Sequence, residues 1–181
     1  KDNDMTRFGF VIEDDKDVAR RNALNLVDTR FIAYDEHELR RHNLVHVFEY
    51  MIGNTEYSLV NPEPGKKCCH NVDILSASEG PPYFALPFDF DFSGLVDAPY
   101  AEPNPKYPIR DVRTRYYKGL CSNNGLLPDT LQLFRDKRSR LFEVIEEIRG
   151  HSFAANLSAR SARSYIEAFY RIIDDADEID E

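Results

Sequence analysis

Hydrophobic positions recur with a helical period in three parts of this chain. The first run leads into a polar loop, and its apolar positions are Leu44, Val47, Phe48, Met51 and Ile52. Steps of three and four residues place these side chains on one face of a helix. Asp35 and Glu38 form a capping-box pattern ahead of the run, and Gly53 is typical of a helix end. The pattern therefore predicts a helix that starts near Asp35 and ends at Ile52.

The last third of the chain repeats this period twice. One run passes through Leu131, Phe134, Arg138, Leu141, Ile145 and Ile148, before Gly150. The other has Tyr165, Ile166, Phe169, Ile172 and Ile173 on its buried face, before an acidic tail at 174–181. Both runs predict helices. Another helix is predicted at 18–27, because the carboxylates at 14–17 are suited to cap it.

Shorter apolar runs predict strands at 7–13, 68–75 and 83–88. Residues 76–82 are few enough to join the last two runs as a hairpin, with 71–75 paired to 83–88. Residues 95–110 contain four prolines, which exclude a regular helix or an interior strand. The predicted fold class is α+β, mostly helical, with one small β-hairpin.

Composition narrows the classes of protein and of partner. A chain of 181 residues with 42% hydrophobic content is expected to form a single domain with a real core. Its 32 acidic and 23 basic residues give a net charge of −9, which makes nucleic acid a poor partner. No apolar run reaches the roughly 18 residues that a membrane-spanning helix needs.

The cysteines and histidines are interpreted as structural. Cys68 and Cys69 are adjacent, and adjacent cysteines rarely bridge each other, so no disulfide is predicted. Three consecutive residues cannot all face one tetrahedral ion, which argues against zinc at 68–70. His42 and His46 are one helical turn apart, a spacing that can bind a metal, but solvated or hydrogen-bonded histidines fit the helix better.

Polar residues that suit a hard cation follow the central helix and the two hairpin strands. Glu56 lies in the loop after the helix, and Asn71 lies at the start of the first strand. Asp89 and Asp91 follow the second strand directly. Carboxylate and amide oxygens, together with substrate phosphates, are the usual ligands of Mg²⁺. These residues therefore predict a divalent metal bound to a phosphate group.

The motifs Gly-Asn-Thr-Glu at 53–56, His-Asn at 70–71 and Asp-Phe-Asp at 89–91 carry a resemblance to a known family. Over residues 7–97 the chain resembles the C-terminal lobe of atypical kinases of the CotH spore-coat type. It is also similar to uncharacterised bacterial proteins with GNTD, HN and DFD motifs. The resemblance implies a strand and hinge at 1–13, a catalytic core at 35–97, an activation-segment-like loop at 98–119 and a helical part at 128–181. The N-terminal lobe of such a kinase is then expected outside this chain.

The resemblance also implies roles for the polar residues. Glu56 matches the catalytic aspartate and would orient or deprotonate an acceptor hydroxyl on a protein. Asn71 and Asp89 would hold Mg²⁺ or Mn²⁺ on the phosphates of ATP, with Asp91 on a second ion or beside the first. Glu56 is one methylene longer than the aspartate of the family, and a misplacement of about 1 Å can cost roughly 10²-fold in rate.

Other interpretations stay open. A catalytically degenerate kinase fold would bind partners without turnover. A phosphohydrolase with a D-x-D motif would use Asp89 as its nucleophile and Asp91 as its acid/base, normally on a doubly wound parallel sheet. Arg113 and Arg115 would lie on one strand face and bind a phosphate or an acidic partner, or else form surface salt bridges.

Overall fold

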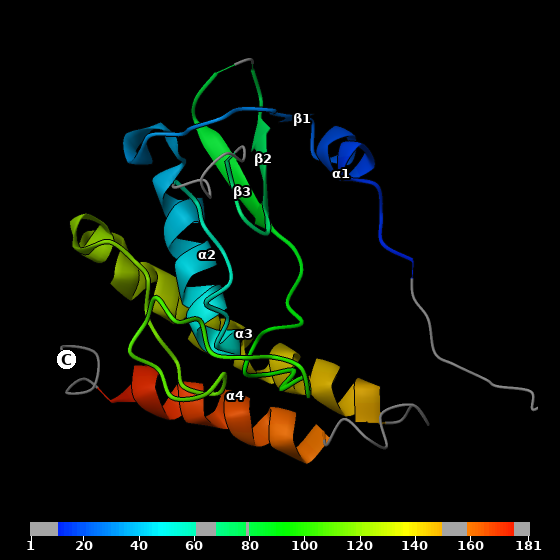
Figure 1. Cartoon of the computed structure of the whole chain (residues 1–181), viewed down its shortest axis with the longest axis vertical. Helices are drawn as coiled ribbons and strands as arrows, with labels where there is room; N and C mark the ends of the chain where they lie inside the picture. Colours follow the sequence, from blue (N-terminus) through cyan, green and yellow to red (C-terminus); the bar gives the residue numbers. More distant parts are fainter. Residues whose placement is uncertain (1–10, 61–67, 79, 150–158, 176–181) are drawn as a thin grey trace, which may run out of the picture.

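The computed structural model describes residues 11–60, 68–78, 80–149 and 159–175. Helix α2 (Leu39–Ile52) lies at the centre of these residues, with a small sheet on one side and helices α3 (Leu127–Arg149) and α4 (Ala159–Asp174) on the other (Figure 1). This arrangement confirms the predicted α+β class and its helical bias.

The end of α2 is confirmed and its start is corrected. Gly53 closes the helix in the left-handed conformation, with φ of 68°. Glu38 is the N-cap, and its Oε2 accepts a hydrogen bond of 2.7 Å from the amide of Arg41. The capping box occurs one turn earlier, where Glu36 Oε2 accepts from the amide of Ala33 and closes a short 3-10 helix (Tyr34–Glu36). The chain bends after that turn, so the long helix starts later than Asp35.

The predicted hairpin is confirmed. Strand β2 (Val72–Ser76) pairs antiparallel with β3 (Tyr83–Pro87), and Val72 lies opposite Pro87. Strand β1 (Asn25–Leu26) adds to the other edge of β2. The sheet order is therefore β1-β2-β3, antiparallel throughout.

The N-terminal predictions are partly wrong. Helix α1 (Asp15–Arg21) is capped by Asp14, as the carboxylates indicated, but it stops before the pair of residues that forms β1. That pair extends because its backbone bonds to β2, which a local pattern does not reveal. Residues 11–13 form no strand, and the rest of the predicted strand at 7–13 lies outside the described residues.

Two clusters of apolar side chains hold the elements around α2. The first joins α2 to α3 and α4 and consists of Val47, Met51, Ile52, Leu131, Phe134, Ile166, Phe169, Tyr170 and Ile173. The second joins α2 to the sheet and the loop behind it and consists of Ile32, Val45, Tyr57, Leu59, Val72, Ile74 and Ala85. Because α2 packs on both sides, its two ends are fixed relative to the hairpin and to the helix pair.

The Pro-rich segment and the two C-terminal helices have the structures that their sequence patterns predicted. Residues 95–110 form no helix or strand, as their prolines predicted. Two arginines of α3 join it to α4, with Arg138 Nη1 at 2.8 Å from Asp174 Oδ2. None of the described helices combines the length and the apolar character needed to cross a membrane.

Candidate functional site

The loop after α2 is folded tightly and carries Glu56 toward the hairpin. Gly53 turns the chain, and Asn54 Oδ1 then accepts a hydrogen bond of 2.9 Å from the amide of Glu56. The amide of Ser58 donates to the carbonyl oxygen of His70 at 3.0 Å. The loop is therefore attached to the residue that precedes Asn71, which brings two of the predicted site segments together.

The third segment lies at the same end of the hairpin. The amide of Phe88 donates to the carbonyl oxygen of Asn71 at 3.0 Å, so the chain remains paired just beyond the strands. Asn71 and Asp89 then both adopt left-handed backbone conformations, with φ of 51° and 59°. Asn and Asp tolerate this region better than other side-chain-bearing residues. These residue types therefore suit the sharp turns that end the pairing.

Glu56, His70, Asp89 and Asp91 form an electrostatic cluster at this end. His70 Nε2 lies 3.7 Å from Glu56 Oε2. Burial raises the pKa of Asp89, the neighbouring carboxylate of Asp91 raises it further, and His70 opposes this shift. Tyr100 donates a hydrogen bond of 3.0 Å to Asp91 Oδ2. Carboxylates from separate segments of the chain thus lie near one imidazole.

Two glycines allow these segments to approach. The amide of Gly94 donates to the carbonyl oxygen of Gly53 at 3.1 Å, and the amide of Leu95 donates to Ile52 at 2.9 Å. A Cβ atom at either glycine would overlap with the hydroxyl of Tyr165 on α4. The segment after Asp91 is therefore fixed against the end of α2, and α4 covers the junction.

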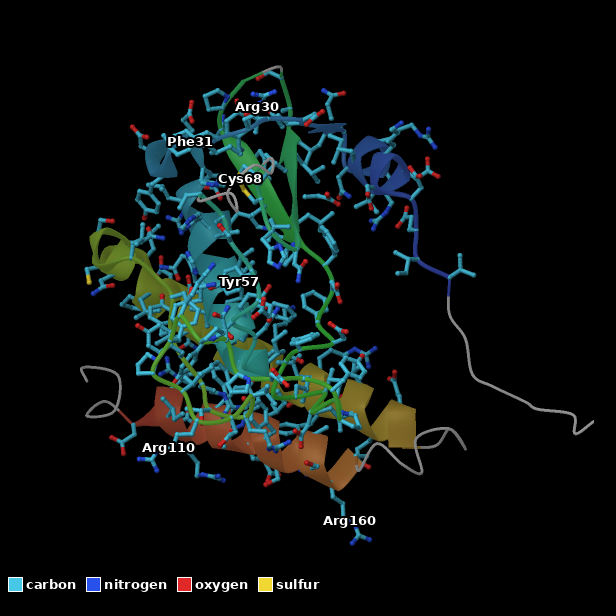
Figure 2. The ribbon with its side chains drawn as sticks, viewed as in Figure 1. Arg30, Phe31, Tyr57, Cys68, Arg110 and Arg160 are labelled. Carbon is cyan, nitrogen blue, oxygen red and sulfur yellow. A yellow bond between two sulfur atoms is a disulfide. The ribbon has the colours of Figure 1, made fainter. Side chains whose placement is uncertain are left out.

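Lys118 stabilises the Glu56 loop from the other side. Its ammonium group donates to the carbonyl oxygens of Thr55, at 3.0 Å, and Tyr57, the two neighbours of Glu56. Tyr57, which is labelled in Figure 2, follows the end of α2. The Lys118 nitrogen lies 3.9 Å from the centroid of its ring, a cation–π contact. Burial lowers the pKa of Lys118 to about 8. No local pattern marks this lysine, because its partners lie some sixty positions earlier in the chain.

Glu49 is a buried acid directly behind the loop, and the sequence pattern did not indicate it. The residue has no exposed surface. Burial raises the pKa of its carboxyl group to about 7, while the amide of Asn54 and the charge of Lys118 act in the opposite direction. Among the described residues, neither carboxylate oxygen has a well-formed hydrogen bond. Burial therefore moves the titration of this group toward neutral pH.

The histidines of α2 are buried, rather than solvated. His46 Nδ1 lies 2.6 Å from the hydroxyl of Tyr57, so this histidine is hydrogen-bonded as expected. The ring of His42 lies between those of His37 and His46, with centroids 4.8 and 4.6 Å away. Burial lowers the pKa of His42 to about 3 and that of His46 to about 4. Both rings are therefore neutral at physiological pH.

A cavity of about 510 Å³ opens beside Glu56. The loop, α2 and the Pro-rich segment all contribute to its walls. Its polar lining residues include His42, Glu56, His70, Lys106 and Lys118. The four tyrosines at its surface are Tyr57, Tyr107, Tyr116 and Tyr117. The predicted site residue Glu56 thus lies at the wall of a cavity of ligand size.

Arg113 and Arg115 do not lie on a strand, because the chain is irregular there. Arg115 donates to the carbonyl oxygens of Met51 and Tyr165, at 3.2 and 2.6 Å. Arg113 donates to Gly94 and to Asp97, both at 3.2 Å. Both guanidinium groups stack on the Tyr165 ring, with that of Arg113 4.7 Å and that of Arg115 3.7 Å from the ring centroid. These contacts are internal to the protein, and a substrate-binding role stays a prediction.

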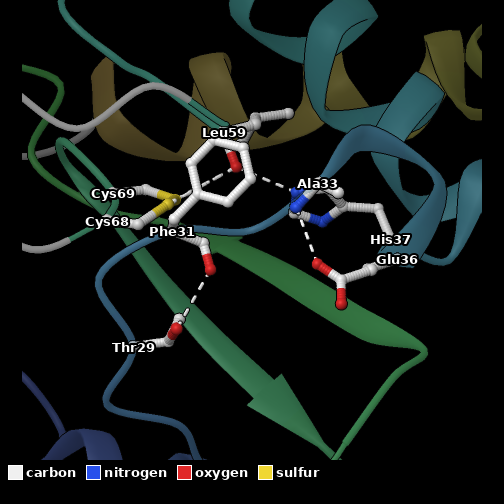
Figure 3. Close-up of a disulfide and its surroundings, with 8 residues drawn as sticks. All are labelled: Thr29, Phe31, Ala33, Glu36, His37, Leu59, Cys68 and Cys69. Atoms are coloured by element: carbon white, nitrogen blue, oxygen red, sulfur yellow. Dashed lines mark hydrogen bonds between the residues drawn. A yellow bond between two sulfur atoms is a disulfide. The ribbon is translucent and has the colours of Figure 1, made fainter.

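The expectation about the adjacent cysteines is wrong, because Cys68 and Cys69 form a disulfide (Figure 3). Their sulfur atoms lie 3.7 and 3.0 Å from the carbonyl oxygen of Leu59. His37 Nε2 contacts the same oxygen at 2.8 Å. The disulfide and the histidine therefore meet at the carbonyl group of Leu59, just after the Glu56 loop. Cys121 is free and exposed.

Within the described ranges, no three His, Cys, Asp or Glu side chains are grouped so as to hold a metal by themselves. A cation held by Asn71, Asp89 and nucleotide phosphates would not need such a group. Comparisons of the chain with protein-family models, with curated proteins and with solved structures gave no match. The functional interpretation therefore depends on the site itself and on the resemblance of its motifs.

Proposed function

We propose that this chain is the C-terminal lobe of a kinase-like phosphotransfer domain. The observation that carries the proposal is that the chain segments of Glu56, Asn71 and Asp89 are joined by backbone hydrogen bonds at one end of the hairpin. The three residues come from separate segments, in the order of a kinase catalytic loop, metal-binding Asn and metal-binding Asp. These backbone hydrogen bonds run from Ser58 to His70 and from Phe88 to Asn71.

The proposed roles follow from position and chemistry. Glu56 accepts the proton of an acceptor hydroxyl, whose oxygen bonds to the γ-phosphorus of ATP as the bond to the bridging oxygen breaks and ADP leaves. His70, at 3.7 Å, orients the Glu56 carboxylate. Lys118 fixes the backbone on both sides of Glu56. Catalysis of this kind depends on positioning and electrostatics more than on covalent chemistry.

The donor set fits Mg²⁺ or Mn²⁺. Asn71 and Asp89 offer the hard oxygen atoms that these ions prefer. The raised pKa of Asp89 supports this fit, because part of it comes from the nearby carboxylate of Asp91. A cation between the phosphates and these side chains would offset that repulsion. When bound, the ion would neutralise charge on the transferred phosphate.

A second candidate is a degenerate kinase fold that binds nucleotide without turnover. The glutamate at position 56, where the family has aspartate, favours it. Such a protein would bind ATP and metal but release no ADP. The phosphohydrolase interpretation is less well supported, because the described sheet is antiparallel and not doubly wound.

The test is the binding of ATP to the full-length protein by isothermal titration calorimetry, with and without Mn²⁺. We expect Mn²⁺-dependent binding that Asp89→Asn abolishes, because the amide loses the anionic ligand. Asn also tolerates the left-handed backbone at position 89, so the variant should fold. Asp136→Asn on the exposed side of α3 is the control with the same charge change. Binding that is independent of metal, or equally weakened by both substitutions, would refute the proposal.

A further inference from the structure

The cavity beside Glu56 has a lining unlike the rest of the protein. The chain carries a net charge of −9, yet the charged groups among the described lining residues are two lysines and one glutamate, besides the histidines. Lys106 and Lys118 both line this cavity, and the charge of Lys106 makes a small contribution to the lowered pKa of Lys118. A cavity with positive charge in excess attracts and retains anions in an otherwise acidic protein.

The lysines lie among aromatic rings. Lys118 Nζ lies 3.9 Å from the centroid of Tyr57 and 5.1 Å from that of Tyr107. Tyr107 in turn packs on Tyr116, with ring centroids 4.7 Å apart. Rings of this kind give an apolar surface for the carbon skeleton of a ligand, and their hydroxyl groups can hydrogen-bond to it.

His42 lies at the inner wall of the cavity. The residue is 1% exposed, and both of its ring nitrogens are buried, so they do not face a ligand in the cavity. The lining groups that can hydrogen-bond to hydroxyl groups of a ligand therefore include the carboxylate of Glu56 and the tyrosine hydroxyls.

We propose that this cavity binds a small polyol that carries a phosphate group. The anionic group contacts Lys106 and Lys118, the carbon skeleton packs on the tyrosines, and a hydroxyl lies next to Glu56. A volume of about 510 Å³ suits a small molecule rather than an extended peptide. The role of this ligand as phosphate acceptor rests on the function proposed above, whereas its binding does not. The acceptor is then a small metabolite-sized anion and not a protein hydroxyl.

The test uses ribose 5-phosphate and glycerol 3-phosphate, each compared with its uncharged parent polyol, ribose or glycerol. Binding to the full-length protein is measured by calorimetry without metal or nucleotide. We expect at least one phosphate ester to bind about tenfold or more tightly than its parent, as a charge-assisted contact provides. Lys106→Gln should weaken that binding by about tenfold, because an exposed lysine is replaced without loss of packing. Lys137→Gln, an equal charge change on the exposed face of α3, should leave it unchanged.

Equal binding of esters and parent polyols, equal weakening by both lysine variants, or no binding of either ester would overturn the inference. Asp89→Asn separates this result from the proposed function. The inference predicts that Asp89→Asn still binds the phosphate ester, although it no longer binds ATP with metal. If wild-type protein binds the ester but never ATP, the cavity is a binding site and its role as acceptor site is refuted. If Asp89→Asn loses the ester, the cavity is not the site of binding.

Discussion

Replacement of Glu49 by Gln should change the pH dependence of stability in a defined direction. Burial raises the pKa of this carboxyl group from 4.5 to about 7 in the folded protein. As pH rises from 4.5 to 7, the unfolded chain loses this proton while the folded protein retains it. The folded state then binds more protons, so this group lowers the free energy of unfolding across that interval. The glutamine side chain of the variant does not titrate, so its free energy of unfolding does not fall with pH for this reason.

The size of the effect follows from the shift. The rise of the pKa from 4.5 to about 7 corresponds to about 3 kcal/mol, at about 1.4 kcal/mol for each tenfold change in proton affinity. No discount for solvent screening is needed, because Glu49 has no exposed surface. The free energy of unfolding of Glu49→Gln, minus that of the wild type, should therefore increase by about 3 kcal/mol between pH 4.5 and 7.5.

Urea denaturation of both proteins at pH 4.5, 5.5, 6.5 and 7.5 measures this difference. His42 and His46 also titrate differently in the two states, but they are present in both proteins and cancel in the subtraction. Glu102→Gln is the control, because its side chain lies in water. It should show a constant difference. A difference that is constant for Glu49→Gln as well would contradict the burial of an uncompensated acid behind the loop.

Three further predictions concern the surrounding structure. Gly53→Ala should lower the free energy of unfolding, measured in urea, by about 1–3 kcal/mol, because φ is left-handed there and the new methyl group overlaps with Tyr165 of α4. Gly125→Ala, with open space around the new methyl group, should lower it far less. Lys118→Met should speed amide hydrogen exchange around Glu56, measured by mass spectrometry, and unchanged exchange there would exclude a role in fixing the loop. Alkylation without reductant should label only Cys121 among the cysteines, and addition of a reductant should raise the number of labelled cysteines to three. Three labelled cysteines without reductant would contradict the disulfide.

Local patterns predicted the elements that hold the site. The helix end at Gly53 is a local feature of one residue type, and the hairpin at 72–87 depends on neighbouring strands and a short loop. Both are encoded within a few residues, so the sequence alone was sufficient. The two-residue strand β1 was missed because it extends only when paired with β2.

Long-range contacts account for what the sequence did not reveal. Lys118 acts on a loop about sixty positions earlier, and Glu49 looks like any polar residue of an amphipathic helix until both sides of α2 are seen to be buried. Arg113 and Arg115 show the reverse case. Their alternation indicated a strand face, but Tyr165 on α4 brings both guanidinium groups to one ring without a strand.

Nuclear magnetic resonance with Mn²⁺ tests the central claim most directly, because this ion broadens the signals of nearby amides. The full-length protein, labelled with ¹⁵N, is titrated with Mn²⁺ in the presence of ATP. The account predicts that the amides of Asn71, Phe88 and Asp89 broaden first and that the amide of Gly125 keeps its intensity. It also predicts that Asp89→Asn removes this broadening. Uniform loss of signal, or broadening centred on another part of the chain, would contradict a metal–phosphate site at the end of the hairpin.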